Sequence, residues 1–152
     1  MSGVEIREAD ESDLPEVLRL YALPDFDDGH ALRLQDAVER LRQMRSYPDY
    51  RLYVALIDGR IVGTFTLLIA EKILHMGAKA AIVDDVIVDT LCRGRAIGKA
   101  MMAAAMDMAR ARGCYKLALS TNAKRIEAHR FYESLGFARH GYSYVIELAN
   151  SS

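Results

Sequence analysis

The stretch VIVDTLCRGRAIGKAMM, from Val86 to Met102, decides the fold of this chain. Its first residues are apolar and β-branched, which favours a strand. A short basic turn with glycine comes next, followed by a run of helix-forming residues. Strand, loop and helix in this order bring free backbone N–H groups and the positive end of a helix dipole to the loop. We therefore expect the loop to bind an anion.

The anion loop fits some phosphate-binding patterns better than others. Gly94 and Gly98 allow the backbone to come close to a ligand. An ATP-type loop needs GxxxxGK followed by Ser or Thr, but the segment is one residue short and continues with Ala100. A dinucleotide fingerprint needs three glycines, and only two can be matched. An acyl-carrier loop and an ordinary tight loop stay open. The residues predicted to line the anion site are Arg93, Gly94, Arg95, Ala96, Ile97, Gly98 and Lys99.

Length and composition limit the class of protein. The 152 residues favour a single domain, assigned to residues 1–152, and the 51% of apolar residues suffice for a core. A net charge of -1 argues against a nucleic-acid partner, because a surface that follows phosphates usually carries a basic excess. No apolar run approaches the roughly 20 residues of a membrane span. Cys92 and Cys114 show no zinc-type spacing, so we expect free thiols, no metal and a soluble cytoplasmic protein.

Hydrophobic periodicity predicts alternating strands and helices. Asp58-Gly59 is a typical hairpin turn, and Gly113 is expected to end the longest helix. The order of these elements predicts an α/β fold. Its sheet is expected to be mixed, of the α+β type, with helices on both faces. Strands are expected at 4–7, 52–57, 61–69, 80–88 and 115–119 and within 137–148; helices are expected from the 10–12 cap to about 20, up to about 46, and at 97–112 and 125–135.

Two motifs, in this order, resemble those of the GNAT superfamily of N-acetyltransferases. RGRAIG, from Arg93 to Gly98, resembles the family's pyrophosphate loop, with Ala96 in place of the usual first glycine. AHRFYESLGF, from Ala128 to Phe137, resembles its AxxFYxxxGF signature. The resemblance covers nearly the whole chain. It implies the GNAT fold, in which a mostly antiparallel sheet has one splayed parallel strand pair and helices on both faces.

The resemblance also implies acetyl coenzyme A as co-substrate, with its diphosphate in the anion loop. Its pantetheine arm is expected to pair with the backbone of Val86, Ile87 and Val88, as an added strand would. A family asparagine is replaced by Arg125, and the nearby Asn122 is assigned to the cofactor instead. A homodimer is a common assembly of the family.

Acetyl transfer to an amine requires a base for the ammonium and an acid for the departing sulfur. The resemblance assigns Tyr132 as the acid; the alternative is a tyrosine that packs in the core. Asp84 and Asp85 interrupt an apolar strand, where carboxylates need partners or a purpose. Period two sends the pair to opposite faces, so that one can line the active cleft. We expect Asp84 to orient or deprotonate the amine; the alternative is a purely structural pair.

The acceptor is expected to be a small amine. Two stretches resemble glucosamine-6-phosphate and aminoalkylphosphonate acetyltransferases, whose substrates carry a phosphorus oxyanion, and Lys79, Arg125 or Arg139 are available to pair with it. Similar stretches are widespread in the superfamily, which leaves the acceptor open. Two alternatives are a domain that binds acetyl coenzyme A as a sensor or scaffold, and an enzyme that acetylates a protein amine.

Overall fold

The computed structural model describes residues 3–24, 29–92, 94, 96–121 and 123–149. The chain divides into two compact units, Met1–Leu119 and Ser120–Ser152. The first unit holds β1 (Glu5–Glu8), α1 (Leu14–Tyr21), α2 (Leu34–Arg45), β2 (Tyr50–Ile57), β3 (Arg60–Ala70), β4 (Lys79–Val88), α3 (Ile97–Ala111) and β5 (Cys114–Ala118), and the second unit holds α4 (Ile126–Ser134).

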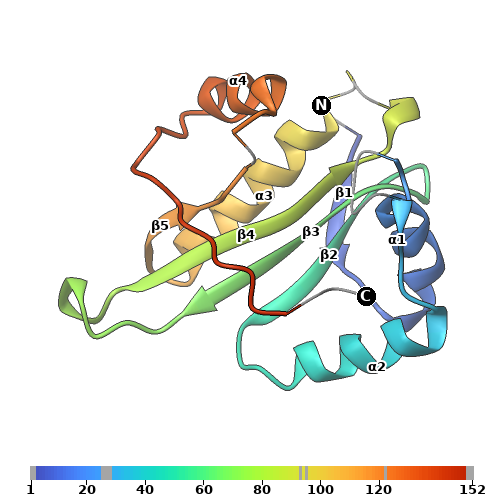
Figure 1. Cartoon of the computed structure of the whole chain (residues 1–152), viewed down its shortest axis with the longest axis horizontal. Helices are drawn as coiled ribbons and strands as arrows, with labels where there is room; N and C mark the ends of the chain where they lie inside the picture. Colours follow the sequence, from blue (N-terminus) through green and yellow to red (C-terminus); the bar gives the residue numbers. More distant parts are fainter. Residues whose placement is uncertain (1–2, 25–28, 93, 95, 122, 150–152) are drawn as a thin grey trace. The chain divides into compact units, whose positions relative to one another are not determined.

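The strands of the first unit form one mixed sheet in the order β1-β2-β3-β4-β5 (Figure 1). The first four strands are antiparallel to their neighbours, and β5 runs parallel to β4. Asp58 and Gly59 join β2 to β3 with φ values of 51° and 77°, the left-handed pair that a two-residue hairpin needs. The predicted mixed sheet, mostly antiparallel with one parallel pair, is confirmed.

Helices cover both faces of this sheet. Leu52, Val54 and Leu56 alternate along β2 and share one buried cluster with α1 and α2. On the other face, α3 packs against β3 at Gly63, where an added Cβ would lie 2.7 Å from Met101 Sδ. The absence of a side chain at Gly63 thus allows the first turns of α3 to lie close to the sheet.

The strand β4 changes its neighbours along its length. Its first half pairs with β5, from Lys79 opposite Cys114 to Ile82 opposite Ala118. Beyond Ile82, the described part of the chain pairs β4 with β3 only. This half of β4 precedes the predicted anion loop, from which a short turn separates it. The splayed parallel pair that the family resemblance implies is therefore present.

A β-bulge interrupts β4 in the same half. Asp84 pairs with Thr66 and Ile87 pairs with Thr64, so two residues of β4, beginning with Asp85, lie opposite one residue of β3. Asp85 has a φ of 50°, a left-handed conformation that aspartate adopts more readily than most residues. A bulge of this kind redirects side chains and ends strict alternation.

The prediction of final strands within 137–148 is wrong. The second unit has α4, but residues 137–149 form no strand. The alternating apolar pattern is present, yet a strand needs a neighbour that accepts and donates its backbone hydrogen bonds, and no described strand pairs with this segment. Five large side chains of the segment are therefore at least 80% exposed, namely Tyr142, Tyr144, Val145, Ile146 and Leu148.

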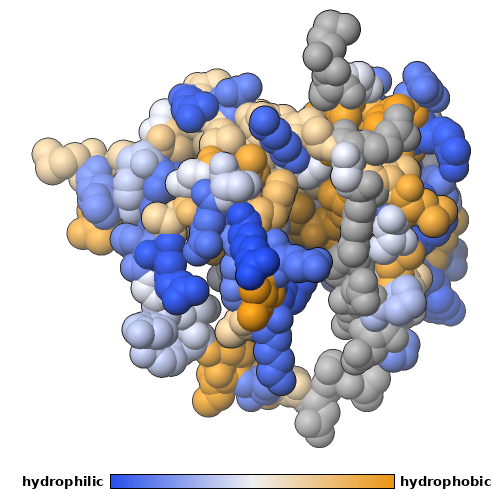
Figure 2. Space-filling view, turned by 90° about the horizontal axis from the view of Figure 1, so that it is seen from above, coloured by the Kyte–Doolittle hydropathy of each residue, from blue (hydrophilic) through white to orange (hydrophobic). Residues whose placement is uncertain are grey.

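The described surface mixes polar and apolar side chains. Figure 2 shows apolar residues scattered among hydrophilic ones on one face of the molecule. In the first unit, Ile73, Leu74 and Met76 are exposed in the connection between β3 and β4. No helix within the described ranges is both long enough and apolar enough to cross a membrane.

Candidate functional site

The connection between β4 and α3 has an unusual backbone. A short 3-10 turn spans Thr90–Cys92, and α3 begins at Ile97. Between them, Gly94 and Ala96 have φ values of 86° and 61°. Glycine adopts this region freely, whereas an alanine is destabilised there by on the order of 1 kcal/mol. Strain of this kind is concentrated at functional sites, and here it lies at the predicted first contact with the anion.

The N-terminus of α3 is suited to bind an anion. Ala96 offers no side-chain cap, and the first backbone N–H groups of any helix have no acceptor within it. Lys99 is exposed in the first turn and adds a positive charge. Helix dipole, N–H groups and lysine together favour a diphosphate at this point. Arg93, Arg95 and Asn122, which we also assigned to the cofactor, lie outside the described residues.

The predicted cofactor-binding strand lies next to the anion loop. Ile87 is buried, and Val86 and Val88 are half-buried. On the β3 side, Ile87 pairs with Thr64 and Val88 with Gly63. On the β5 side, this half of β4 has no strand partner among the described residues. An extended ligand that carries amide groups can therefore hydrogen-bond to this edge as an added strand would.

The two aspartates of β4 lie together at the bulge. Both are exposed, and Asp84 Oδ1 accepts a hydrogen bond from the Asp85 backbone N–H at 2.9 Å. Partial burial and then the charge of Asp84 raise the pKa of Asp85. Our prediction that period two separates the carboxylates assumes a regular strand, and the bulge interrupts that regularity at Asp85. The negative charges of both carboxylates raise the pKa of the same two phenols, Tyr21 and Tyr50.

These phenols were missed by the sequence analysis. Tyr21 ends α1 and Tyr50 begins β2, so no local motif links them to β4. Burial raises the pKa of both tyrosines, and the carboxylates Asp85 and Asp84 raise it further. Both phenols therefore stay neutral and can donate a hydrogen bond. Thr66 connects the cluster, because it hydrogen-bonds to the Tyr50 phenol and donates to the Asp84 carbonyl oxygen at 3.2 Å.

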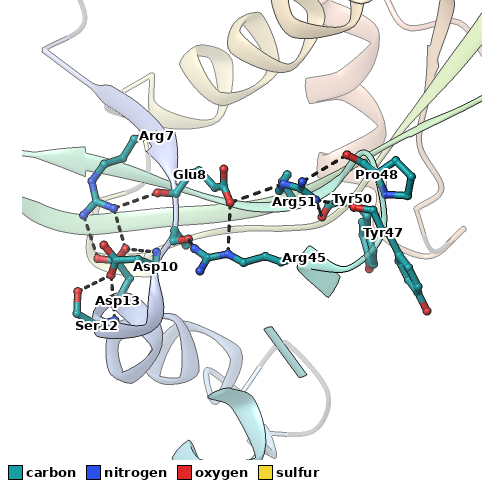
Figure 3. A network of polar contacts seen from close by, with 11 residues as sticks. Arg7, Glu8, Asp10, Ser12, Asp13, Arg45, Tyr47, Pro48, Tyr50 and Arg51 are labelled. Carbon is teal, nitrogen blue, oxygen red and sulfur yellow. Dashed lines mark hydrogen bonds and ion pairs between the residues drawn. The ribbon is translucent and has the colours of Figure 1, made fainter. Parts of the chain in front are cut away.

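A polar network fixes the turn that carries Tyr50 (Figure 3). Arg51 donates to the carbonyl oxygens of Tyr47 at 2.9 Å and of Tyr50 at 2.8 Å. The same guanidinium forms an ion pair with Glu8 of β1, at 3.7 Å. The Tyr47 ring stacks on Tyr50, with centroids 5.9 Å apart. Charge-assisted hydrogen bonds from Arg51 thus hold the turn, and the ion pair with Glu8 links it to β1 at the sheet edge.

In the second unit, Tyr132 lies on α4 and is half-buried. Its ring contacts Phe131 at 5.1 Å and Phe137 at 5.7 Å between centroids. Its carbonyl oxygen accepts the Phe137 N–H at 3.1 Å, which closes the C-terminal end of the helix. The signature residues FY and GF are therefore in contact with each other. The catalytic role of Tyr132 stays a prediction.

Comparisons with known proteins agree with this architecture. Residues 14–137 match the model of the acetyltransferase (GNAT) family. Glucosamine 6-phosphate N-acetyltransferase of Trypanosoma brucei brucei is 32% identical over 138 residues, 90% of each chain. Aminoalkylphosphonate N-acetyltransferase of Salmonella typhimurium is 31% identical over 120 residues, 79% of this chain and 70% of that one. The crystal structure of glucosamine-6-phosphate N-acetyltransferase from Arabidopsis thaliana has a TM-score of 0.83 at 27% identity, covering 96% of this chain and 99% of that one.

A mixed sheet with one splayed parallel pair, an anion loop before a long helix and the helical FY signature define an acyltransferase. The chain belongs to the GNAT acetyltransferase family. The family that the two motifs resemble is thereby confirmed. The family match extends over parts of both compact units, and the assignment of residues 1–152 to one domain stays a prediction.

Proposed function

We propose that this protein transfers an acetyl group from acetyl coenzyme A to a small primary amine. The amine attacks directly in a ternary complex, without an acyl-enzyme. One observation carries the proposal: the half of β4 that β5 leaves unpaired is followed, after the 3-10 turn Thr90–Cys92, by the left-handed turn before α3. The first feature suits the amides of pantetheine and the second suits a diphosphate, and they follow one another along the chain.

Successive segments of the chain are assigned to different parts of acetyl coenzyme A. The backbone of Val86, Ile87 and Val88 binds the pantetheine arm. The loop and the first turn of α3 bind the diphosphate, and Asn122 binds a further part of the molecule. Acetyl coenzyme A supplies an activated thioester when it is bound. The loop residues that we assign to the diphosphate are Arg93, Gly94, Arg95, Ala96, Ile97, Gly98 and Lys99.

The bulge cluster serves the acceptor amine. Asp84 orients the ammonium group, since the Asp85 N–H holds its Oδ1 atom at 2.9 Å. Asp85 is suited to accept the proton, directly or through water, because its raised pKa lies closer to a working pH than that of an ordinary aspartate. Tyr132 donates a proton to the departing sulfur. Holding amine and thioester together supplies much of the rate gain.

The proposed acceptor carries a phosphate or phosphonate group. The names of the relatives from Trypanosoma brucei brucei and Salmonella typhimurium support this class of substrate. A homodimer and a cytoplasmic location are further parts of the proposal. The free thiols Cys92 and Cys114 are compatible with a reducing compartment. Size-exclusion chromatography with light scattering tests the dimer.

The test is thiol release from acetyl coenzyme A in the presence of phosphorylated amines, plain amines and a peptide amine. We expect release with a small amine, and a lower rate with a shifted pH profile in Asp84→Asn. Binding of coenzyme A without release on any amine would instead identify a sensor or scaffold. Release with the peptide alone would identify a protein acetyltransferase. An unchanged pH–rate profile in Asp84→Asn removes the role of this residue.

A further inference from the structure

Asp89 is a buried carboxylate that the proposed mechanism does not use. It directly follows β4 and is only 6% exposed, next to the connection that leads to α3. An ionised carboxylate is costly to bury unless its oxygens are paired. The partners of Asp89 therefore indicate what the residue does.

The backbone of Asp89 and one of its carboxylate oxygens set the turn that follows. Its N–H donates to the Val62 carbonyl oxygen at 2.8 Å, which extends the contact with β3 by one residue. Its Oδ1 accepts the N–H of Leu91 at 3.1 Å, and its carbonyl oxygen accepts the N–H of Cys92 at 2.9 Å. These bonds close the 3-10 turn Thr90–Cys92 and fix the direction in which the chain enters the anion loop.

The second carboxylate oxygen is held from another element. Arg19 Nη2, from α1, lies 3.1 Å from Asp89 Oδ2 and 3.5 Å from the Ile61 carbonyl oxygen of β3. The other end of the loop is fixed as well, because Ile97 is 2% exposed where α3 begins. Two buried residues, Asp89 and Ile97, thus lie on either side of the loop, and Arg19 pairs with the first of them.

We propose that Asp89, held by Arg19, is a positioning residue that sets the anion loop in its diphosphate-binding conformation. The inference rests on the proposed function, because it takes the diphosphate of acetyl coenzyme A as the anion. A loop that is out of place loses contacts to the diphosphate only. The pantetheine arm is bound by the β4 backbone before Asp89 and is unaffected.

The test compares the affinities for coenzyme A and for pantetheine, which has no diphosphate, by NMR titration of the whole protein. In Asp89→Asn we expect at least tenfold weaker binding of coenzyme A, with the affinity for pantetheine unchanged within twofold. Arg19→Gln should show the same selective loss, and the double variant should lose little more than either single variant, because both changes break one interaction. If Asp89→Asn fails to fold, Arg19→Gln alone tests the inference, because Arg19 is the half-exposed partner of the pair.

The chain offers a closely matched control. Asp13 has a side-chain exposure of 7%, near the 8% of Asp89, and pairs with Arg7 at 2.7 Å. It also accepts a backbone N–H, that of Asp10, at 2.9 Å. Asp13→Asn should lower the thermal midpoint and leave both affinities within twofold. Equal weakening of both ligands in Asp89→Asn, or no weakening of coenzyme A, overturns the inference. A wild-type protein that binds no coenzyme A overturns the proposed function itself.

Discussion

Among single residues, Asp85 has the most unusual environment on the acceptor side. It lies in a left-handed backbone conformation, is partly dehydrated by its neighbours and is repelled by Asp84. These effects oppose its ionisation in the folded protein. The folded state therefore holds the Asp85 proton more tightly than the unfolded chain does, and ionisation of this residue at neutral pH lowers the stability of the wild-type protein.

We expect Asp85→Asn to be more stable than the wild type at pH 7.5. The folded pKa is raised, so the wild type loses stability as the pH rises from the unfolded value, about 3.9, through the folded value. The advantage of the variant should accordingly shrink towards pH 4. Urea unfolding at pH 4, 5.5 and 7.5 measures the difference in stability between the variant and the wild type. Asp58→Asn, at an exposed hairpin position that is also left-handed, reports the backbone effect alone. A difference that is equal at all three pH values contradicts the prediction.

Removing the phenol oxygen of Tyr132 distinguishes a role as the acid from a role in packing alone. Tyr132→Phe keeps the ring contacts to Phe131 and Phe137. We expect turnover to fall by about 10²–10⁴, the usual contribution of a placed acid, with the affinity for coenzyme A within threefold of the wild type. Steady-state kinetics and calorimetry measure the two quantities. Tyr142→Phe, at a position 88% exposed, is the control. An unchanged turnover would leave Tyr132 with a packing role only.

The sequence indicated some members of the acceptor cluster but not others. Two charges within an apolar strand identified Asp84 and Asp85, because such residues are unusual wherever the strand is buried. Tyr21 and Tyr50 carry no such signal, since tyrosines beside turns are common. Their link to the aspartates depends on the fold, because the two carboxylates affect phenols that come from α1 and β2. The bulge itself cannot be recognised from the composition of the strand, because it depends on the register between β4 and β3.

At the scale of elements, β4 organises the donor side by changing its neighbours. Periodicity predicted its position, and the helices α3 and α4 were predicted to within one residue at each end. The point where β5 leaves β4, after Ile82, depends on backbone pairing that periodicity does not encode. The same limit explains the error at 137–148. An apolar alternation becomes a strand only where another strand pairs with its backbone.

At Gly63, the helix α3 lies close to the sheet. An added Cβ would lie 2.7 Å from Met101 Sδ and 3.2 Å from the Ile87 carbonyl oxygen. We expect Gly63→Ala to lower the free energy of unfolding by about 1–3 kcal/mol through overpacking. In combination with Met101→Ala, the loss should be smaller than the sum of the single losses, because the new methyl group fills vacated space. Urea unfolding of the four proteins measures the coupling, and strict additivity would argue against the contact.

For the whole molecule, the proposed chemistry is divided between the two compact units. The anion loop, β4 and the acidic bulge belong to the first, and Tyr132 belongs to the second. The proposed acceptor also has two parts with different requirements, an ammonium group and a phosphate group. In the proposed complex the two aspartates attract its ammonium group, whereas a phosphate needs a cation. The cation must also lie far enough from the carboxylates to leave their attraction for the amine intact.

Lys79 is poorly placed for that phosphate. It precedes Asp84 by five residues on one strand, which is roughly 16 Å at the usual strand rise. Few bonds separate amine from phosphate in a small phosphorylated amine, which makes this span too long. Lys79 also forms an ion pair with Glu71, at 3.7 Å. Among the three basic residues that the sequence offered, we therefore predict Arg125 or Arg139, both of the second unit, as the phosphate partner.

We therefore expect glucosamine 6-phosphate to exceed glucosamine in kcat/KM at least tenfold in the wild-type protein. Arg125→Ala or Arg139→Ala should abolish this preference and leave kcat/KM for glucosamine within threefold, because a charge-assisted hydrogen bond to phosphate contributes only when the phosphate is present. Lys79→Ala is the control and should keep the preference. Initial rates of thiol release for both sugars give the ratio in each variant. Loss of the preference in Lys79→Ala, with both arginine variants unchanged, would place the phosphate at the start of β4 and reverse the assignment.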